Sequence, residues 1–288
     1  MLTAKYSNRQ DTRATQILPL FGVNWFRFAC FGLLVASILP GTPEIVAADS
    51  VPDATELLQS AIQRARRMAE ATNAPVYLYD KRTTIDTLDS KGRVTQQKVK
   101  LFEVTMTGGV PRERLIGLEG KRLSARALAQ EAEKSDRWRR KFEKPEGNSN
   151  RRSFVPADMA AKFDFRYLKV DRIRDRQTHV IAFTPKSPAP AAKGFGDRIV
   201  NQLAGRLWID VADSQITRLD VKLGEKVNLW GGLLGALNKF GFQLDRRRSD
   251  EGVWYNHLCD ISLDARGLLK RLRMNIKERS SNFRESPK

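Results

Sequence analysis

Side chains that could carry out chemistry are few and scattered in this chain. The 288 residues include two histidines, His179 and His257, and two cysteines, Cys30 and Cys259. His257 and Cys259 are two apart and face one side of an expected strand, but structural zinc needs four nitrogen or sulfur ligands. No Gly-x-Ser-x-Gly, His-Glu-x-x-His or P-loop sequence occurs. We therefore expect no enzyme activity, no catalytic residue, no metal and no cofactor.

The charge balance points to a partner instead. Lys and Arg number 51 against 33 Asp and Glu, a formal net charge of +18, and 41% of residues are hydrophobic, which excludes compositional disorder. Each basic cluster alone is typical of a solvated face, but together they predict a surface that attracts polyanions. The residues expected to form this anion-binding surface are Arg64, Arg66, Arg67, Arg137, Arg139, Arg140, Arg246, Arg247 and Arg248.

The N-terminal segment predicts export. An uncharged apolar run, residues 28–39, follows several basic residues and precedes Pro40-Gly41, and Val46-Ala47-Ala48 predicts cleavage after Ala48. Residues 1–48 would then be a signal peptide and the mature protein periplasmic. The alternative is an uncleaved anchor over residues 17–39, because about 20 apolar residues span a bilayer.

Export changes both the expected partner and the thiol count. A periplasmic protein does not meet nucleic acid, so the counterpart of the basic surface would be anionic membrane lipid or lipopolysaccharide. Removal of Cys30 leaves Cys259 alone, which excludes an internal disulfide. The sequence of residues 254–259 (WYNHLC) is typical of a strand and predicts a buried, inert thiol.

The elements that follow predict an α+β fold. Asp53 and Glu56 form a capping box before apolar residues at helical spacing, which indicates a helix over residues 53–71. Most of the rest alternates with period two between turn sequences, and the change of face between Leu101 and Phe102 suits a bulge. We expect one domain, residues 49–288, with a large curved antiparallel sheet over a few helices. A second helix is expected near residues 124–144, and flexible insertions near 144–153 and 187–196.

The segment 229–237 (LWGGLLGAL) is apolar where polar turn residues are expected between two strands. It suits a flap over a cavity mouth. The alternative is a short core helix that plugs one end of the sheet. In either case the expected ligand-lining residues are Trp230, Leu233, Leu234 and Leu237 with Phe240 and Phe242 of the next strand.

One longer pattern is recognisable. Residues 205–213 (GRLWIDVAD) and the returning strand at 216–219, together with residues 120–123 (GKRL) and 281–284 (SNFR), resemble the outer-membrane lipoprotein carriers, the LolA/LolB-like group. The resemblance implies an unclosed antiparallel half-barrel over helices, with an apolar cavity that shields acyl chains. Within the pattern we interpret Trp208 as a packed strand residue and Asp210 as solvated or turn-supporting.

Two functional hypotheses follow. The first is an exported periplasmic lipid- or lipoprotein-binding protein, which takes part in lipoprotein sorting and holds acyl chains in an apolar cavity. The second is an envelope sensor or protein-interaction module of the same fold without carrier activity. The sequence does not identify the ligand, the protein partner or the oligomeric state.

Overall fold

The computed structural model describes residues 51–71, 74–142, 159–192, 194–229, 235–267 and 270–287. The expected signal segment and the expected insertion near 144–153 lie outside these ranges. No helix in the described ranges is long and apolar enough to cross a membrane. The helices are α2 (Ala54–Glu70), α3 (Ala125–Phe142), α4 (Met159–Lys162) and α5 (Phe195–Val200).

Helix α2 forms as the sequence predicts. The Asp53 carboxylate accepts hydrogen bonds from the backbone N–H groups of Thr55 (2.6 Å) and Glu56 (3.0 Å), which caps the helix N-terminus. Its buried residues are Ala54, Leu58 and Ala61, at the spacing of one helix face. The helix therefore packs on the sheet through a narrow apolar stripe.

Most of the remaining described residues form antiparallel strands. The strand order is β4-β3-β2-β1-β12-β11-β10-β8-β7-β6-β5, with β9 paired to β10, and no pairing among the described residues joins β4 to β5. The α+β class and the unclosed antiparallel sheet are confirmed. The strands are β1 (Val76–Leu88), β2 (Val94–Thr107), β3 (Val110–Leu118), β4 (Lys121–Arg122), β5 (Phe163–Ile173), β6 (Arg176–Pro185), β7 (Leu203–Asp210), β8 (Ile216–Leu223), β9 (Val227–Leu229), β10 (Gly235–Arg248), β11 (Trp254–Gly267) and β12 (Arg271–Glu285).

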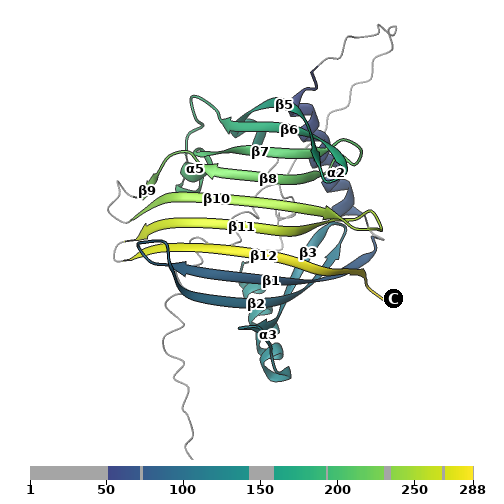
Figure 1. Cartoon of the computed structure of the whole chain (residues 1–288), viewed down its shortest axis with the longest axis vertical. Coiled ribbons are helices and arrows are strands. Elements are labelled where there is room, and N and C mark those ends of the chain that lie inside the picture. Colours follow the sequence, from purple (N-terminus) through teal and green to yellow (C-terminus); the bar gives the residue numbers. More distant parts are fainter. Residues whose placement is uncertain are drawn as a thin grey trace, which may run out of the picture.

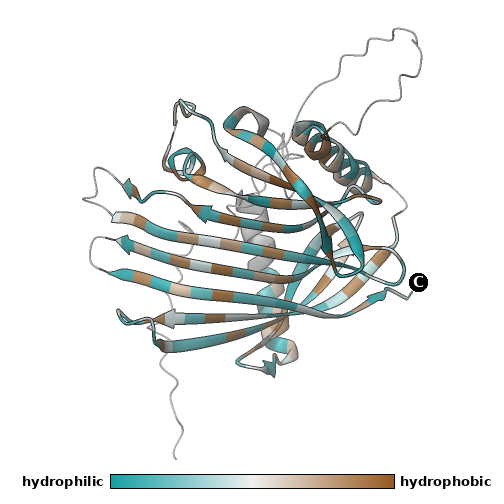
Figure 2. Ribbon diagram, turned by 45° about the horizontal axis from the view of Figure 1, so that its top comes forward, coloured by the Kyte–Doolittle hydropathy of each residue, from teal (hydrophilic) through white to brown (hydrophobic). Residues whose placement is uncertain are grey.

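The sheet curves, and helices pack near its two ends (Figure 1). Helix α2 contacts β5 and β7, α5 contacts β9, and α3 contacts β3. Apolar and polar residues alternate along the strands, so the two faces differ (Figure 2). We call the face that packs against α2 the inner face and the opposite one the outer face. The main core cluster joins α2 to the inner face through residues such as Leu58, Ile181, Leu207 and Leu244.

Two local predictions have opposite outcomes. The pairing of β2 with β3 shifts register between Leu101 and Phe102, so the expected bulge is confirmed. Strand β10, however, begins at Gly235, and Ala236 and Leu237 already pair with β9 and β11. The last three residues of the expected 229–237 flap or plug are thus strand. Their backbone polar groups are satisfied by the two neighbouring strands.

Candidate functional site

A continuous row of side chains crosses the inner face from β5 to β1. Cross-strand partners in an antiparallel sheet lie on the same face, so the register fixes which residues adjoin. Apart from one glycine, every member of this row is apolar. In spatial order the row is Phe165, Phe183, Gly205, Val221, Phe242, Ile261, Ile276 and Ile85.

The packing around Gly205 explains why the recognisable GRLWID pattern begins with glycine. A β-carbon at this position would overlap the carbonyl oxygen of Asp220 and lie 2.8 Å from the Phe183 ring. Phe183 is buried and packs edge-to-face with Phe163. The glycine thus makes room for an aromatic side chain inside the apolar row, a packing role.

The apolar row extends beyond the helices at its two ends. From β5 to β10 its members belong to the core that packs with α2, and Ile261 of β11 packs against that core. On β11 and β1, Ile261 and Ile85 are only half-buried, and the neighbouring inner residues Phe240 and Leu263 are also half-buried. This central part of the inner face thus has partly exposed apolar side chains.

The next row of the inner face changes character along its length. It runs through Leu207, Leu219, Leu244 and Cys259 and then reaches Glu278 and Thr83. The apolar surface therefore ends at polar and charged groups on β12 and β1. An amphipathic ligand requires such a boundary between apolar and polar surface.

A buried lysine is the centre of this polar end. The Lys81 Nζ lies 2.7 Å from Glu113 Oε1 and 3.1 Å from Glu278 Oε1, and the Lys81 side chain is 7% exposed. Thr83 Oγ1 donates to the same Glu278 oxygen at 3.3 Å, and the Phe102 ring centroid lies 4.8 Å from Nζ. Burial lowers the pKa of Lys81, but the two carboxylates raise it more, so the lysine stays charged.

This charged cluster was not predicted from the sequence, although the position of Lys81 in an alternating strand indicates that it points inward. Tyr79, Lys81, Thr83 and Ile85 alternate along β1, so the lysine falls on the same face as apolar residues. A lysine at an inward position needs an acidic partner. Which glutamates supply it depends on strand pairing, because Glu113 and Glu278 are far away in sequence.

The expected ligand-lining residues are only partly within the described ranges. Trp230, Leu233 and Leu234 lie outside them. Leu237 and Phe242 are buried in the core cluster, and Phe240 is half-buried against it. The side chains of Phe240 and Phe242 thus lie on the inner face with the apolar row.

A separate hollow of about 320 Å³ lies on the outer face over β8, β10, β11 and β12. Gly241 is part of its lining, and a β-carbon there would lie 2.6 Å from the Ser262 hydroxyl oxygen. Seven of its eleven lining residues have polar or charged side chains, although most of the surface that lines the hollow is apolar. The residues around the hollow are Asp220, Lys222, Gly241, Phe242, Gln243, Asp260, Ile261, Ser262, Asn275, Ile276 and Lys277.

The structure separates the expected anion-binding arginines into different environments. Arg64 and Arg67 are exposed on α2, Arg66 is half-buried, and Arg247 is exposed on β10. Arg248 Nε forms an ion pair with Asp213 at 2.9 Å. The side chains of Arg137, Arg139 and Arg140 on α3 lie outside the described part of the chain.

Arg246 corrects the expectation of a surface residue. Its guanidinium donates to Gln215 Oε1 (3.1 Å), the Ile216 carbonyl (3.1 Å) and the Trp254 carbonyl (3.0 Å). Burial lowers the pKa of Arg246 to about 10. The side chain joins β8, β10 and β11, so it stabilises the fold and is not free to bind an external anion.

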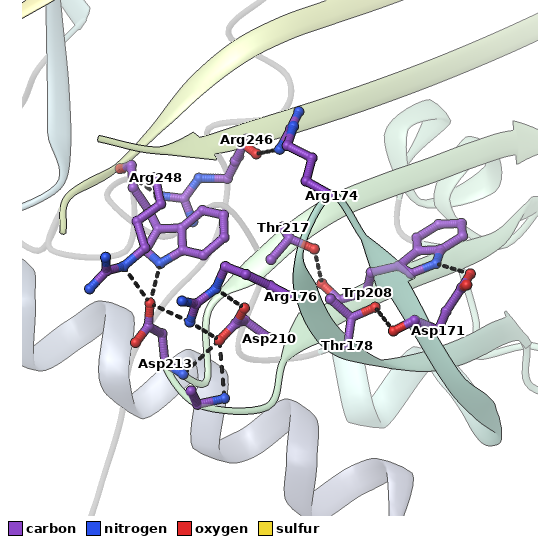
Figure 3. Close-up of polar contacts among 12 residues, drawn as sticks. Asp171, Arg174, Arg176, Thr178, Trp208, Asp210, Asp213, Thr217, Arg246 and Arg248 are labelled. Carbon is purple, nitrogen blue, oxygen red and sulfur yellow. Dashed lines mark hydrogen bonds and ion pairs between the residues drawn. The ribbon is translucent and has the colours of Figure 1, made fainter. Parts of the chain in front are cut away.

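The turn between β7 and β8 has a polar network that includes two residues of the recognisable pattern (Figure 3). Asp210 accepts hydrogen bonds from Arg176 Nε (2.5 Å) and from the backbone N–H groups of Ala212 and Asp213, and it is 1% exposed. Burial raises the pKa of Asp210, but these hydrogen bonds lower it more. Asp210 thus supports the turn, as one of the two interpretations had it.

The contacts of Trp208 also support the fold. Its Nε1 donates to Asp171 at 3.3 Å, and the Arg218 guanidinium lies 5.6 Å from its ring centroid. The residue is half-buried within β7. Among the described residues, no group of three or more His, Cys, Asp or Glu is arranged to hold a metal ion.

Comparison with known proteins gives similarity at the level of structure. No protein-family model matches the chain, and no curated protein matches it. A domain from Vibrio parahaemolyticus named for outer-membrane lipoprotein sorting is 13% identical at a TM-score of 0.31, covering 81% of this chain and 93% of its own.

Two further solved structures are similar at a TM-score of 0.27 and 11% identity. A LolA superfamily protein from Nitrosomonas europaea is covered over 94% of its length and MucB, in complex with the periplasmic part of MucA, over 100%. They cover 80% and 82% of this chain. Similarity at these identities and scores assigns no function to this chain.

Proposed function

We propose that the chain is an exported periplasmic protein that binds the acyl chain of a lipid or lipoprotein on the inner face of its sheet, as a lipoprotein-sorting protein would. The observation that carries the proposal is the apolar row, which continues from the core through the buried Ile276 and leaves Ile261 and Ile85 half-buried. Each methylene transferred from water to this surface contributes about 0.8 kcal/mol. Export is inferred from the apolar run at residues 28–39.

The polar boundary of the inner face supports an amphipathic ligand. Lys81, Glu113 and Glu278 lie beside the apolar row, because Glu278 is two residues from Ile276 on β12. A polar ligand end at this cluster keeps its hydrogen bonds while the chain lies over the isoleucines. The exposed Arg64, Arg67 and Arg247 would hold the protein near anionic headgroups, each contributing about 1 kcal/mol near such a surface.

Native mass spectrometry of the purified full chain, before and after delipidation, tests the proposal directly. We expect a bound lipid of defined mass before delipidation and uptake of a fluorescent fatty acid afterwards. A chain that is empty and takes up no fatty acid would contradict acyl binding. That result would favour the alternative, an envelope sensor or protein-interaction module.

A matched pair of variants locates the binding surface. Ile261 and Ser262 are adjacent on β11 and face opposite sides, the first half-buried and the second exposed. We expect Ile261→Asn to weaken fatty-acid uptake about tenfold or more, since a polar group replaces apolar contact surface, and Ser262→Asn to leave it unchanged. Circular dichroism and thermal melting would check that both variants fold.

The milder variant Ile85→Thr places a hydroxyl in the same row on β1. It provides the test of fatty-acid uptake if Ile261→Asn does not fold. The apolar run at residues 28–39 is common to all variants, so differences among them report on the inner face. Equal uptake by the inner-face and outer-face variants would show that the ligand lies elsewhere.

A further inference from the structure

Two exposed arginines stand directly opposite each other on the outer face. Arg82 of β1 and Arg279 of β12 are cross-strand partners. The residues that flank Arg82, Lys81 and Thr83, are buried on the inner face, which places the Arg82 side chain on the outer one. Lys277 is exposed two residues before Arg279 and so extends the same basic cluster.

This arrangement costs folding free energy. Like charges directly opposite on adjacent strands are destabilising. Within the described ranges, the side chains of Arg82, Lys277 and Arg279 form no hydrogen bond or ion pair, whereas four other arginines are each paired with an aspartate: Arg174, Arg176, Arg218 and Arg271. An unpaired cross-strand arginine pair in a sheet rich in ion pairs calls for a ligand.

The geometry of the cluster fits a phosphate group. Opposing β-carbons lie about 4.5–5.5 Å apart, so both guanidinium groups can reach one tetrahedral anion. The planar fork of arginine donates two parallel hydrogen bonds to phosphate oxygens, and a lysine adds a point charge. Arg82 and Arg279 therefore supply two guanidinium groups to a single anion, and Lys277 adds a third cation that also faces Asp260 on β11.

The hollow on the outer face adjoins this cluster, because Lys277 is part of its lining. Gln243, Ser262 and Asn275 offer polar groups there, and Asp220 and Asp260 offer carboxylates that accept from hydroxyl or amine groups. The Asp220 Oδ1 is buried and receives no hydrogen bond within the described part of the chain. A volume of about 320 Å³ suits a small polar group attached to the phosphate.

We propose that Arg82, Lys277 and Arg279 form a phosphate-binding site on the outer face, with the adjoining hollow holding the hydroxyl- or amine-bearing remainder of a phosphate ester. The ester is either a lipid headgroup or a soluble phosphate ester. This site lies on the opposite face from the proposed acyl-binding surface and does not depend on it.

Thermal melting and calorimetric titration of the full chain test the proposal. The probes are inorganic phosphate, glycerophosphoethanolamine and vesicles that contain phosphatidylglycerol, all at matched ionic strength. We expect Arg82→Gln/Arg279→Gln to weaken binding at least about tenfold, as the loss of two charge-assisted contacts implies. The control Arg166→Gln/Arg172→Gln removes the same charge from exposed arginines of β5 and should bind as the parent chain does.

A second readout separates a binding role from a structural one. Without ligand, Arg82→Gln/Arg279→Gln should melt at the same or a higher temperature than the parent, because a like-charge contact is removed. Arg279→Lys keeps the charge but loses the fork, so we expect intermediate affinity. Arg279→Lys also provides the affinity test if the double variant does not fold.

The results distinguish a lipid headgroup from a soluble phosphate ester and show whether the site binds phosphate at all. Binding of vesicles without binding of the two soluble probes would assign the site to lipid headgroups, and binding of glycerophosphoethanolamine at similar affinity would assign it to the ester itself. Equal loss in both double variants, or no phosphate-dependent binding at all, would overturn the proposal. Fatty-acid uptake by Arg82→Gln/Arg279→Gln should be unchanged, which keeps this test separate from that of the inner face.

Discussion

Gly108, in the turn between β2 and β3, lies against the main chain of Met68 near the end of α2. A β-carbon on Gly108 would overlap the Met68 carbonyl oxygen, and Gly108 has a φ of 56°. On another side, Gln215 of the β7–β8 turn donates to the Met68 sulfur at 3.1 Å. The end of α2 is thus held between turns from two separate parts of the unclosed sheet.

This contact predicts that Gly108→Ala destabilises the protein more than an alanine at an open turn. Gly92 also has a positive φ, 81°, but no atom would lie within 4 Å of its β-carbon. We expect Gly92→Ala to cost about 1–2 kcal/mol for the left-handed backbone and Gly108→Ala to cost about 1–3 kcal/mol more for the overlap with α2. Urea unfolding of the two variants measures the difference, and equal losses would contradict the α2 contact.

The position of Arg246 predicts a contrast with its neighbour. Arg246→Ala leaves the Ile216 and Trp254 carbonyls without their donor, so we expect a loss of about 2–4 kcal/mol in unfolding free energy. Arg247→Ala, at an exposed position, should change it by less than about 0.5 kcal/mol. Chemical denaturation checks both. Similar effects at the two positions would argue against the structural role of Arg246.

Asp264 predicts a specific pH dependence. Arg271 donates to both carboxylate oxygens, at 2.9 and 2.7 Å, and Arg273 donates at 3.0 Å. The Arg271 hydrogen bonds are the main cause that lowers the pKa of Asp264 to about 2. A lowered pKa in the folded state contributes stability above the ordinary value of 3.8, and this stability is lost as pH falls towards about 2.

Accordingly, Asp264→Asn should melt at a lower temperature than the parent chain at neutral pH, and the gap should close as pH falls from 3.8 towards about 2. Asp260→Asn on the same strand is exposed and provides the control. A gap that stays constant down to the lowest pH would mean that the Asp264 charge does not stabilise the fold.

Cys259 should be unreactive in the folded protein. Its side chain is 9% exposed, and burial raises the pKa of its thiol, so little thiolate is present and little reaches the solvent. We expect iodoacetamide to modify Cys259 only after unfolding, as followed by peptide mapping, which distinguishes it from Cys30. Rapid modification of Cys259 in the native protein would contradict this environment.

Local features of the fold could be predicted from sequence because their causes are local. The Asp53 cap and the apolar spacing of α2 depend on residues within a few positions of each other. The bulge at Leu101 and Phe102 appears as a break in the two-residue alternation. The same alternation indicates which residues of one strand share a face, and thus the composition of each face.

Pairing between distant strands was decided only by the tertiary structure. The sequence placed Arg246 with Arg247 and Arg248 as one basic surface, but β8 and β11 enclose its guanidinium. The partners of Lys81 and the opposition of Arg82 and Arg279 depend equally on register. Sequence alternation determines which face a side chain occupies, whereas strand order and register determine its neighbours, because these are set by the joint packing of all strands and helices.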